Sequence, residues 1–235
     1  MKNRFGVLID LIFPPYANCL ACGTRRIAAK EPPLCTDCAD KLLAGRMPQN
    51  ICLTCGHILT GPGCSYCHKG VTKKIGWMRA AYAYHDTASS LVRRLKYSGV
   101  DKAGEILAAE MVQAFHKGHP PPVTLVTSVP IDKKHLFERG GDHAKVIALC
   151  VSEALGLPYE TLLLAHAKRK RQTGLPRAER LKNKKGVYEA VHPIEGQHVL
   201  LIDDVLTTGS TAAACADVLL KAGAASVSVL CAAFS

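Results

Sequence analysis

Eight cysteines arranged as four Cys-x-x-Cys pairs constrain the fold of this chain more than any other sequence feature. The pairs are Cys19/Cys22, Cys35/Cys38, Cys52/Cys55 and Cys64/Cys67. Two sulfurs on one tight knuckle reach a single tetrahedral zinc ion at about 2.3 Å, and two pairs complete its four-sulfur shell. Disulfides would be expected in an exported chain, but the apolar run Phe5–Phe13 is too short for an export signal. The pairs therefore predict two structural zinc sites.

The spacing of the pairs leaves open how they divide between two ions. A sequential division puts the first two pairs on one ion and the last two on the other, and a crossed division also fits. His57 and His68 lie close by in the sequence and could replace a ligand, although four cysteines per ion is the simpler interpretation. Four sulfurs leave no open position for catalysis. A redox role would need a thioredoxin-like helix start, which the surrounding sequence does not supply.

The character of the sequence changes near residue 76. Residues 1–75 are rich in Gly, Pro, Thr and Cys and have short apolar runs, so they cannot fold by hydrophobic burial alone. From Trp77 onward, β-branched runs alternate with stretches of helical periodicity. We therefore expect a double zinc-binding module at 1–75 and an α/β domain with a mostly parallel sheet at 76–235. No apolar run approaches the roughly 18 residues that cross a bilayer, so no membrane span is expected.

Four strands and four helices are expected in the second part. The strands are Met78–Tyr84, Val123–Val129, Val199–Ile202 and Val227–Leu230, and the helices are Thr87–Tyr97, Lys102–His116, Asp142–Leu155 and Ser210–Lys221. Strands that alternate with helices indicate βαβ crossovers. Ligands of such sheets bind at the carboxyl ends of the strands.

The segment Val199-Leu-Leu-Ile-Asp-Asp-Val-Leu-Thr-Thr-Gly-Ser-Thr211 carries the strongest functional signal. A buried strand delivers Asp203 and Asp204 to its carboxyl end, where their carboxylates suit the two cis hydroxyls of a ribose. The loop Thr207-Thr208-Gly209-Ser210-Thr211 then opens a helix, whose amides and hydroxyls suit a phosphate dianion. The segment predicts a receptor for a ribose 5-phosphate group. The alternative is that Ser210 only caps the helix and that the acids are exposed strand ends.

This segment resembles the signature of type I phosphoribosyltransferases, which bind 5-phosphoribosyl 1-diphosphate (PRPP) there. Cys-x-x-Cys pairs ahead of such a domain resemble the ComF family, and the resemblance covers nearly the whole chain. Its other matching pieces are Leu95-Lys-Tyr97, Val129-Pro130 with Glu138-Arg-Gly140, and Gln172-Thr-Gly-Leu-Pro-Arg-Ala-Glu-Arg180 followed by Asn183. The resemblance implies a type I phosphoribosyltransferase-like parallel sheet with helices on both faces, preceded by a cysteine-rich double zinc ribbon.

The resemblance also implies a function and a set of site residues. The family is associated with natural DNA uptake, so we expect a cytoplasmic competence protein that binds PRPP, or a nucleotide 5′-phosphate, together with Mg²⁺. Single-stranded DNA and a competence helicase or other DNA-processing proteins are the expected partners. The implied PRPP contacts are Asp203, Asp204, Thr207, Thr208, Gly209, Ser210, Thr211, Arg139, Lys96, Gln172 and Arg180. Among these, Arg139 and Lys96 are expected near the diphosphate, and Gln172 and Arg180 in a segment that closes over PRPP.

The distribution of charge supports an anionic partner. The formal net charge is +11, and two four-sulfur zinc sites of charge −2 each would lower it to about +7. Lys168–Lys185 alone contains nine basic residues and one acid, Glu179. Such a patch is typical of a surface that meets phosphate or nucleic acid, and a solvated loop is the alternative. Aromatic residues make up only 6%, so backbone contacts are expected rather than base stacking.

Two positions bear on whether the protein turns over PRPP. The ComF family usually has Arg-Gly-Phe-Asn-Gln where this chain has Arg139-Gly-Gly-Asp-His143, so Asp142 replaces an amide and would repel a diphosphate or bind it through magnesium. Purine-salvage relatives have an acid at the position of Thr207. A threonine cannot act as a base in its place. We assign no catalytic residue and favour a receptor. The alternatives are an active phosphoribosyltransferase with an unknown nitrogenous acceptor and a protein-docking factor that uses its zinc module.

Overall fold

The computed structural model describes most of the chain. Described are residues 16–24, 26–28, 33–68, 71–98, 101–132, 136–137, 141–166 and 187–235. Several residues discussed above lie outside these ranges. They are the expected apolar segment Phe5–Phe13, the expected diphosphate contact Arg139, and the basic segment Lys168–Lys185 with Gln172 and Arg180. Among the described residues, no helix has the length and apolar character that crossing a membrane requires.

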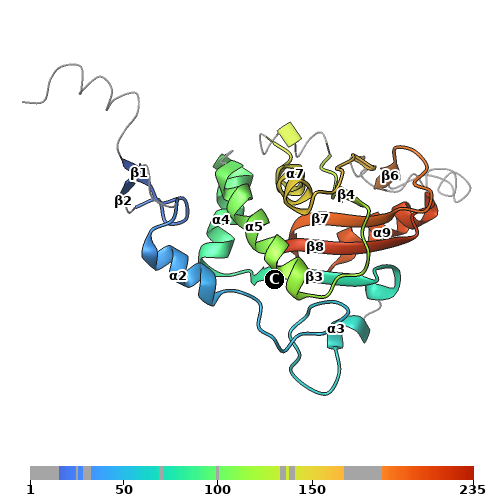
Figure 1. The fold of residues 1–235 in the computed structure, drawn as a ribbon, viewed down its shortest axis with the longest axis horizontal. Helices are drawn as coiled ribbons and strands as arrows, with labels where there is room; N and C mark the ends of the chain where they lie inside the picture. Colours follow the sequence, from blue (N-terminus) through green and yellow to red (C-terminus); the bar gives the residue numbers. More distant parts are fainter. Residues whose placement is uncertain are drawn as a thin grey trace, which may run out of the picture.

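A parallel sheet of four strands forms the centre of the molecule (Figure 1). Its order is β3 (Trp77–Ala83), β8 (Ser226–Phe234), β7 (His198–Leu206) and β4 (Leu125–Ser128). All neighbouring pairs are parallel, and Leu200 lies between Val126 of β4 and Ser228 of β8. The expected parallel sheet is thus confirmed, and β7 and β8 continue four residues beyond the ends expected from the sequence.

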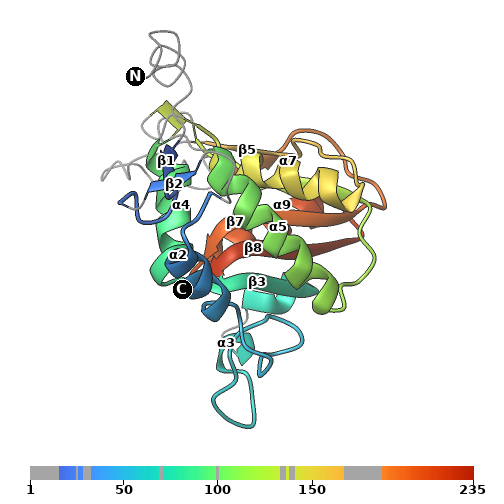
Figure 2. The same ribbon diagram turned by 60° about the vertical axis from the view of Figure 1, so that its left-hand side comes forward.

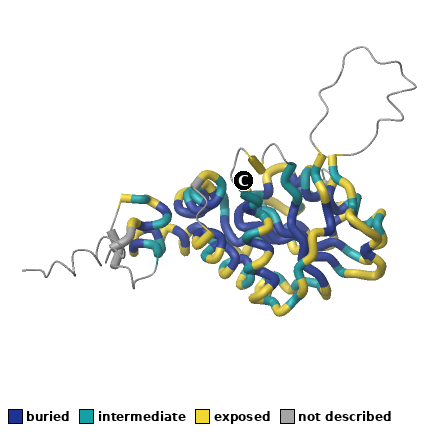
Figure 3. Tube along the Cα trace, turned by 90° about the horizontal axis from the view of Figure 1, so that it is seen from above, coloured by how far each residue is buried: buried dark blue, intermediate teal, exposed yellow. Residues whose placement is uncertain are grey.

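Helices cover both faces of this sheet, as expected. On one face lie α4 (Asp86–Ser98), α5 (Asp101–Lys117) and α7 (His143–Leu155), and on the other lies α9 (Ser210–Lys221) (Figure 2). Side chains of a strand alternate between the two faces. Leu200 and Ile202 accordingly join the core under α4, α5 and α7, whereas Val199 and Leu201 join the core under α9. Figure 3 shows buried stretches of the chain gathered in the middle of the larger part of the molecule, with exposed stretches around them.

The ends of α7 follow the signals in the sequence. Asp142 is its N-cap and accepts a hydrogen bond from the amide of Lys145, at 3.0 Å. Gly156 ends the helix in the left-handed region at φ 65°, which glycine adopts without steric cost. The helix start at Asp142 and the stop at Gly156 are therefore both confirmed.

A small antiparallel hairpin stands beside the main sheet and was not expected from the sequence. It pairs β5 (Leu163–Ala165) with β6 (Tyr188–Ala190). Each strand has only three residues, which is too short for an alternating pattern to identify it. The hairpin packs on α9 through β6.

The cysteine-rich part adds short elements on two sides of the α/β part (Figure 1). They are β1 (Tyr16–Asn18), β2 (Arg26–Ala28), α2 (Thr36–Ala44), α3 (Ser65–His68) and the 3-10 helix η1 (Val71–Lys74). The segment after α2 runs along the edge strand β3, where the amide of Met47 donates to the carbonyl of Ala81 at 3.0 Å. Cys19 and its neighbours share the core under α4, and Cys55 shares the core under α9.

Candidate functional site

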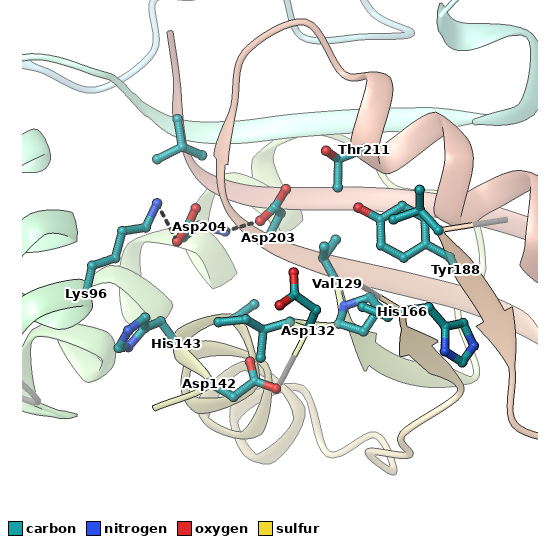
Figure 4. Close-up of a pocket in the computed structure, with 16 residues that line it drawn as sticks. Lys96, Val129, Asp132, Asp142, His143, His166, Tyr188, Asp203, Asp204 and Thr211 are labelled. Carbon is teal, nitrogen blue, oxygen red and sulfur yellow. Dashed lines mark hydrogen bonds and ion pairs between the residues drawn. The ribbon is translucent and has the colours of Figure 1, made fainter. Parts of the chain in front are cut away.

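The carboxyl ends of β4 and β7 open onto a cavity of 430 Å³ (Figure 4). Its wall is formed by the ends of these strands, the start of α7, the end of α4, and the β5–β6 hairpin. The lining residues are Lys96, Val129, Pro130, Ile131, Asp132, Asp142, His143, Ala144, Ala165, His166, Val187, Tyr188, Asp203, Asp204, Val205 and Thr211. The cavity therefore occupies the position where parallel sheets bind their ligands.

The two adjacent acids lie within β7 and point in different directions. Asp204 Oδ2 is 2.7 Å from Lys96 Nζ, and the two side chains are only 13% and 18% exposed. Asp203 Oδ1 accepts a hydrogen bond from the amide of Asp204 at 2.8 Å. Figure 4 shows the Asp204 carboxylate turned toward Lys96 and the Asp203 carboxylate turned toward Thr211. Lys96 thus neutralises Asp204, and Asp203 is the acid on the side of the loop that opens α9.

The loop from Thr207 to Thr211 leads directly into α9. Gly209 has φ 69°, in the left-handed region, and its carbonyl accepts the helix hydrogen bond of Ala213 at 2.8 Å. The hydroxyls of Thr208 and Ser210 lie 3.0 Å apart. Thr207, Thr208 and Ser210 are exposed, and Thr211 lines the cavity. The start of a twelve-residue helix is thus open to an anion, which such helix ends favour.

Four of the lining residues are aspartates. Asp132, in the loop after β4, and Asp142, at the start of α7, join the two acids of β7. Burial raises the pKa of Asp142, and the hydrogen bond from the Lys145 amide opposes that shift. Carboxylate oxygens are ligands that Mg²⁺ accepts when phosphates supply others. Asp132 and Asp142 are the lining residues on this side of the cavity whose chemistry would suit Mg²⁺.

Four polar residues of the cavity were missed by the sequence analysis. They are Asp132, His143, His166 and Tyr188. His166 Nε2 lies 2.7 Å from Glu189 Oε2. Burial raises the pKa of Tyr188, and a hydrogen bond with Thr211 opposes the shift. His166 precedes the basic segment Lys168–Lys185 and Tyr188 follows it. That position in the sequence was the only signal that could have identified these two residues.

Both groups of four cysteines come together as compact clusters. Cys19, Cys22, Cys35 and Cys38 form one, and Cys52, Cys55, Cys64 and Cys67 form the other, with all sulfurs of a group within 4.8 Å of one another. In the second, the Cys52–Cys67 and Cys55–Cys64 sulfur pairs lie 3.7 and 3.4 Å apart. Sulfurs around tetrahedral zinc lie about 3.8 Å apart, and a disulfide would need about 2 Å. The sequential division of the pairs is therefore confirmed.

Backbone amides prepare one thiol of each cluster for a metal. Burial alone would raise the pKa of Cys19, but the amides of Cys35, Cys22 and Ala21 donate to its sulfur and lower it. In the second cluster, the amides of Cys55 and Thr54 overcome burial in the same way and lower the pKa of Cys52 to about 7. Thiolates are the form that binds zinc. His57 stacks on Tyr66 at 5.3 Å between ring centroids and is not a member of either cluster.

The fold and the cavity define a phosphoribosyltransferase-type domain, and comparison with known proteins agrees. The phosphoribosyl transferase domain family matches residues 98–234. The chain is 29% identical over 206 residues to the DNA utilization protein YhgH of Salmonella typhi, covering 84% of this chain and 88% of that protein. It is 27% identical over 205 residues to the competence protein ComFC of Bacillus subtilis, covering 84% and 82%.

Together with the two cysteine clusters, these matches show that the chain belongs to the ComF/YhgH family of phosphoribosyl transferase domain proteins. Among solved structures, PRPP amidotransferase from B. subtilis aligns with a TM-score of 0.41 at 26% identity, over 55% of this chain and 26% of that one.

Proposed function

We propose that this protein binds PRPP, or the 5′-phosphate of a nucleotide, together with single-stranded DNA, as a cytoplasmic protein of DNA uptake or utilization. The observation that carries the proposal is the strand–loop–helix unit of β7 and α9. In this unit, Gly209 adopts a left-handed conformation in an exposed loop rich in hydroxyl groups, and the loop lies beside a cavity of 430 Å³. The names of the relatives, DNA utilization protein and competence protein, support the cellular role. A competence helicase and other DNA-processing proteins remain the proposed partners.

The described residues divide into three roles in this proposal. The 5′-phosphate binds the loop Thr207–Thr211 at the start of α9, where the helix dipole and hydroxyls favour a dianion. The carboxylate of Asp203 accepts hydrogen bonds from the ribose hydroxyls. Asp132 and Asp142 share Mg²⁺ with the diphosphate. Arg139, which lies outside the described residues, is a further proposed contact of the diphosphate. Lys96 acts on the ligand mainly by holding Asp204 in place.

Calorimetry with PRPP and Mg²⁺ tests this proposal. We expect one molecule of PRPP to bind per chain, and Asp203→Asn to weaken binding by about tenfold or more, because hydrogen bonds to a charged group contribute about 1.5–3 kcal/mol each. Asp37→Asn on α2 removes the same charge from an exposed surface position and should leave binding unchanged. Wild-type protein that produces no binding heat, or equal affinities of the two variants, would contradict the proposal.

A catalytic reaction is the second candidate function, and one contact favours it. His166 lines the cavity and is hydrogen-bonded to Glu189. The pair could therefore accept a proton from a nitrogenous acceptor, which Thr207 cannot do. Diphosphate released from PRPP in proportion to protein, and lost in both Asp203→Asn and His166→Gln, would assign a transferase. Binding without release, measured on the same samples, would assign a receptor.

Salt titration tests the nucleic-acid part of the proposal. Single-stranded DNA that contacts the basic segment Lys168–Lys185 should bind more weakly as salt increases, with a log–log slope of about −0.7 per neutralised phosphate. The double variant Lys184→Gln/Lys185→Gln should make this slope shallower by about 1.4. Lys41→Gln/Lys117→Gln, which removes two charges elsewhere, should not. A flat salt response in the wild type would favour the protein-docking alternative instead.

We also propose that each cysteine cluster holds one structural Zn²⁺. The four-sulfur donor set, the sulfur separations in the second cluster and the amide hydrogen bonds to Cys19 and Cys52 support this assignment. Magnesium and calcium prefer oxygen ligands, so they do not suit these sites.

A further inference from the structure

A buried arginine lies beneath the second cysteine cluster. Arg79 is on β3 and is only 5% exposed. Its Nη2 donates to the carbonyl of Leu53 at 2.8 Å and to that of Gly118 at 3.2 Å, and its Nη1 donates to the carbonyl of Met78 at 2.7 Å. Leu53 lies inside the knuckle Cys52-Leu-Thr-Cys55, so the guanidinium holds the backbone of a metal-binding knuckle directly.

Other contacts keep the same knuckle pressed against β3. The amide of Met78 donates to the carbonyl of Thr54 at 2.8 Å. Gly56, which follows the knuckle, has φ 69°, and a Cβ atom there would lie 2.9 Å from the Met78 carbonyl oxygen and 3.4 Å from Arg79 Cδ. Only glycine allows this approach, so the second cluster and Arg79 are brought together by several independent contacts.

The charge of Arg79 needs a partner that no carboxylate provides. Across the described ranges, no carboxylate lies within ion-pair distance of Arg79, and all its hydrogen-bond acceptors are neutral carbonyls. The Trp77 ring, whose centroid lies 5.0 Å from the guanidinium carbon, is a weak partner for this charge, and a buried charge without an opposite charge nearby is strongly unfavourable. Four thiolates around one Zn²⁺ would carry a net charge of −2 and would supply the opposite charge.

We infer that Arg79 is the outer-sphere partner of the second zinc centre, where it balances the negative zinc–thiolate group and joins that group to the sheet. The inference rests on the proposed zinc assignment of this cluster. Partners in the outer shell orient the ligands and commonly change metal affinity by about 10- to 100-fold. Arg79 is thus a positioning residue for the metal and has no contact with the PRPP cavity.

The first cluster offers an internal comparison. Gly23 follows Cys22 with φ 71°, and a Cβ atom there would collide with Arg94 Nη2 on α4. Arg94 is half-buried, whereas Arg79 is buried. Water can therefore reach the Arg94 side chain, and its removal should affect the first centre less than removal of Arg79 affects the second.

Cadmium-113 NMR of the full-length chain tests the inference one site at a time. The cadmium-loaded wild type should give two resonances in the four-sulfur range. Arg79→Met, which keeps the bulk but loses the charge, should shift one of them and accelerate zinc transfer from that site to the chelator 4-(2-pyridylazo)resorcinol by about tenfold. Arg79→Lys, which keeps the charge without the planar fork, should restore part of the difference. Arg94→Met should leave that resonance and that release rate unchanged.

The outcomes separate the inference from the assignment on which it rests. A wild-type chain with fewer than two metal ions would overturn the zinc assignment itself. Two bound ions, with the spectrum and both release rates of Arg79→Met equal to those of the wild type, would overturn only the role of Arg79. If Arg79→Met does not fold, Arg79→Lys is compared directly with the wild type, and equal release rates would again overturn the role.

Discussion

Removing the metal from the purified protein should unfold its N-terminal third and strongly destabilise the rest. Structural zinc contributes about 10 kcal/mol or more per site in small zinc-binding units, whereas the free energy of unfolding of a whole domain is about 5–15 kcal/mol. Without zinc, the buried thiols of Cys19, Cys35 and Cys38 would be left together in the core under α4, and that of Cys55 in the core under α9. A loss of only about 5 kcal/mol would lower the melting temperature by about 15 °C, as followed by circular dichroism with and without a chelator.

The control for this experiment is the same chelator saturated with zinc, which should leave the melting temperature unchanged. Metal content must be measured on every sample, because incomplete removal would hide the effect. A fully metal-free chain that melts at the temperature of the zinc-loaded chain would show that the clusters do not stabilise the fold through zinc.

Asp204→Ala should lower the free energy of unfolding by about 3 kcal/mol. The substitution leaves the ammonium of Lys96 buried without a partner, and breaking one side of a buried ion pair typically costs about 3–5 kcal/mol. The double variant Lys96→Met/Asp204→Ala should recover most of the loss, because it removes the unpaired charge as well. Asp203→Asn, which keeps the size of the side chain and leaves the Lys96–Asp204 ion pair in place, should cost much less. Urea unfolding of the wild type, Lys96→Met, Asp204→Ala and the double variant measures the coupling between the two positions.

An Asp204→Ala variant within about 0.5 kcal/mol of the wild type would contradict the importance of this ion pair. The expected instability also affects the design of binding assays. A loss of PRPP binding in Asp204→Ala would be ambiguous between a missing contact and a disturbed fold, so Asp203→Asn is the better probe of the ligand site.

Local patterns were enough to predict most of the fold. The apolar alternation before Asp203, the cap at Asp142 and the glycine at 156 each act within a few residues, so the parallel sheet and its helices could be expected from the sequence. The extra length of β7 and β8 could not, because their last residues are held by pairing with each other, as Leu206 is with Phe234. The three-residue strands of the hairpin are likewise set by tertiary packing.

The candidate site was predicted in outline and not in its internal contacts. Asp203, Asp204 and the loop Thr207–Thr211 belong to one sequence motif, and the cavity lies beside them. The pairing of Lys96 with Asp204 joins α4 to β7, which are distant in the sequence, so no spacing rule could indicate it. The division of the cysteine pairs between two clusters depended in the same way on how the chain folds back. Arg79 carried no sequence signal, because its surroundings exist only after folding.

The two cysteine clusters join opposite cores of the same sheet, the first under α4 and the second under α9. The cysteine-rich segment therefore packs against the α/β part on both faces of the sheet. A gene fragment encoding only the latter would produce a protein with two bare apolar areas, which favours aggregation. Evolution is thus expected to retain or lose the two parts together.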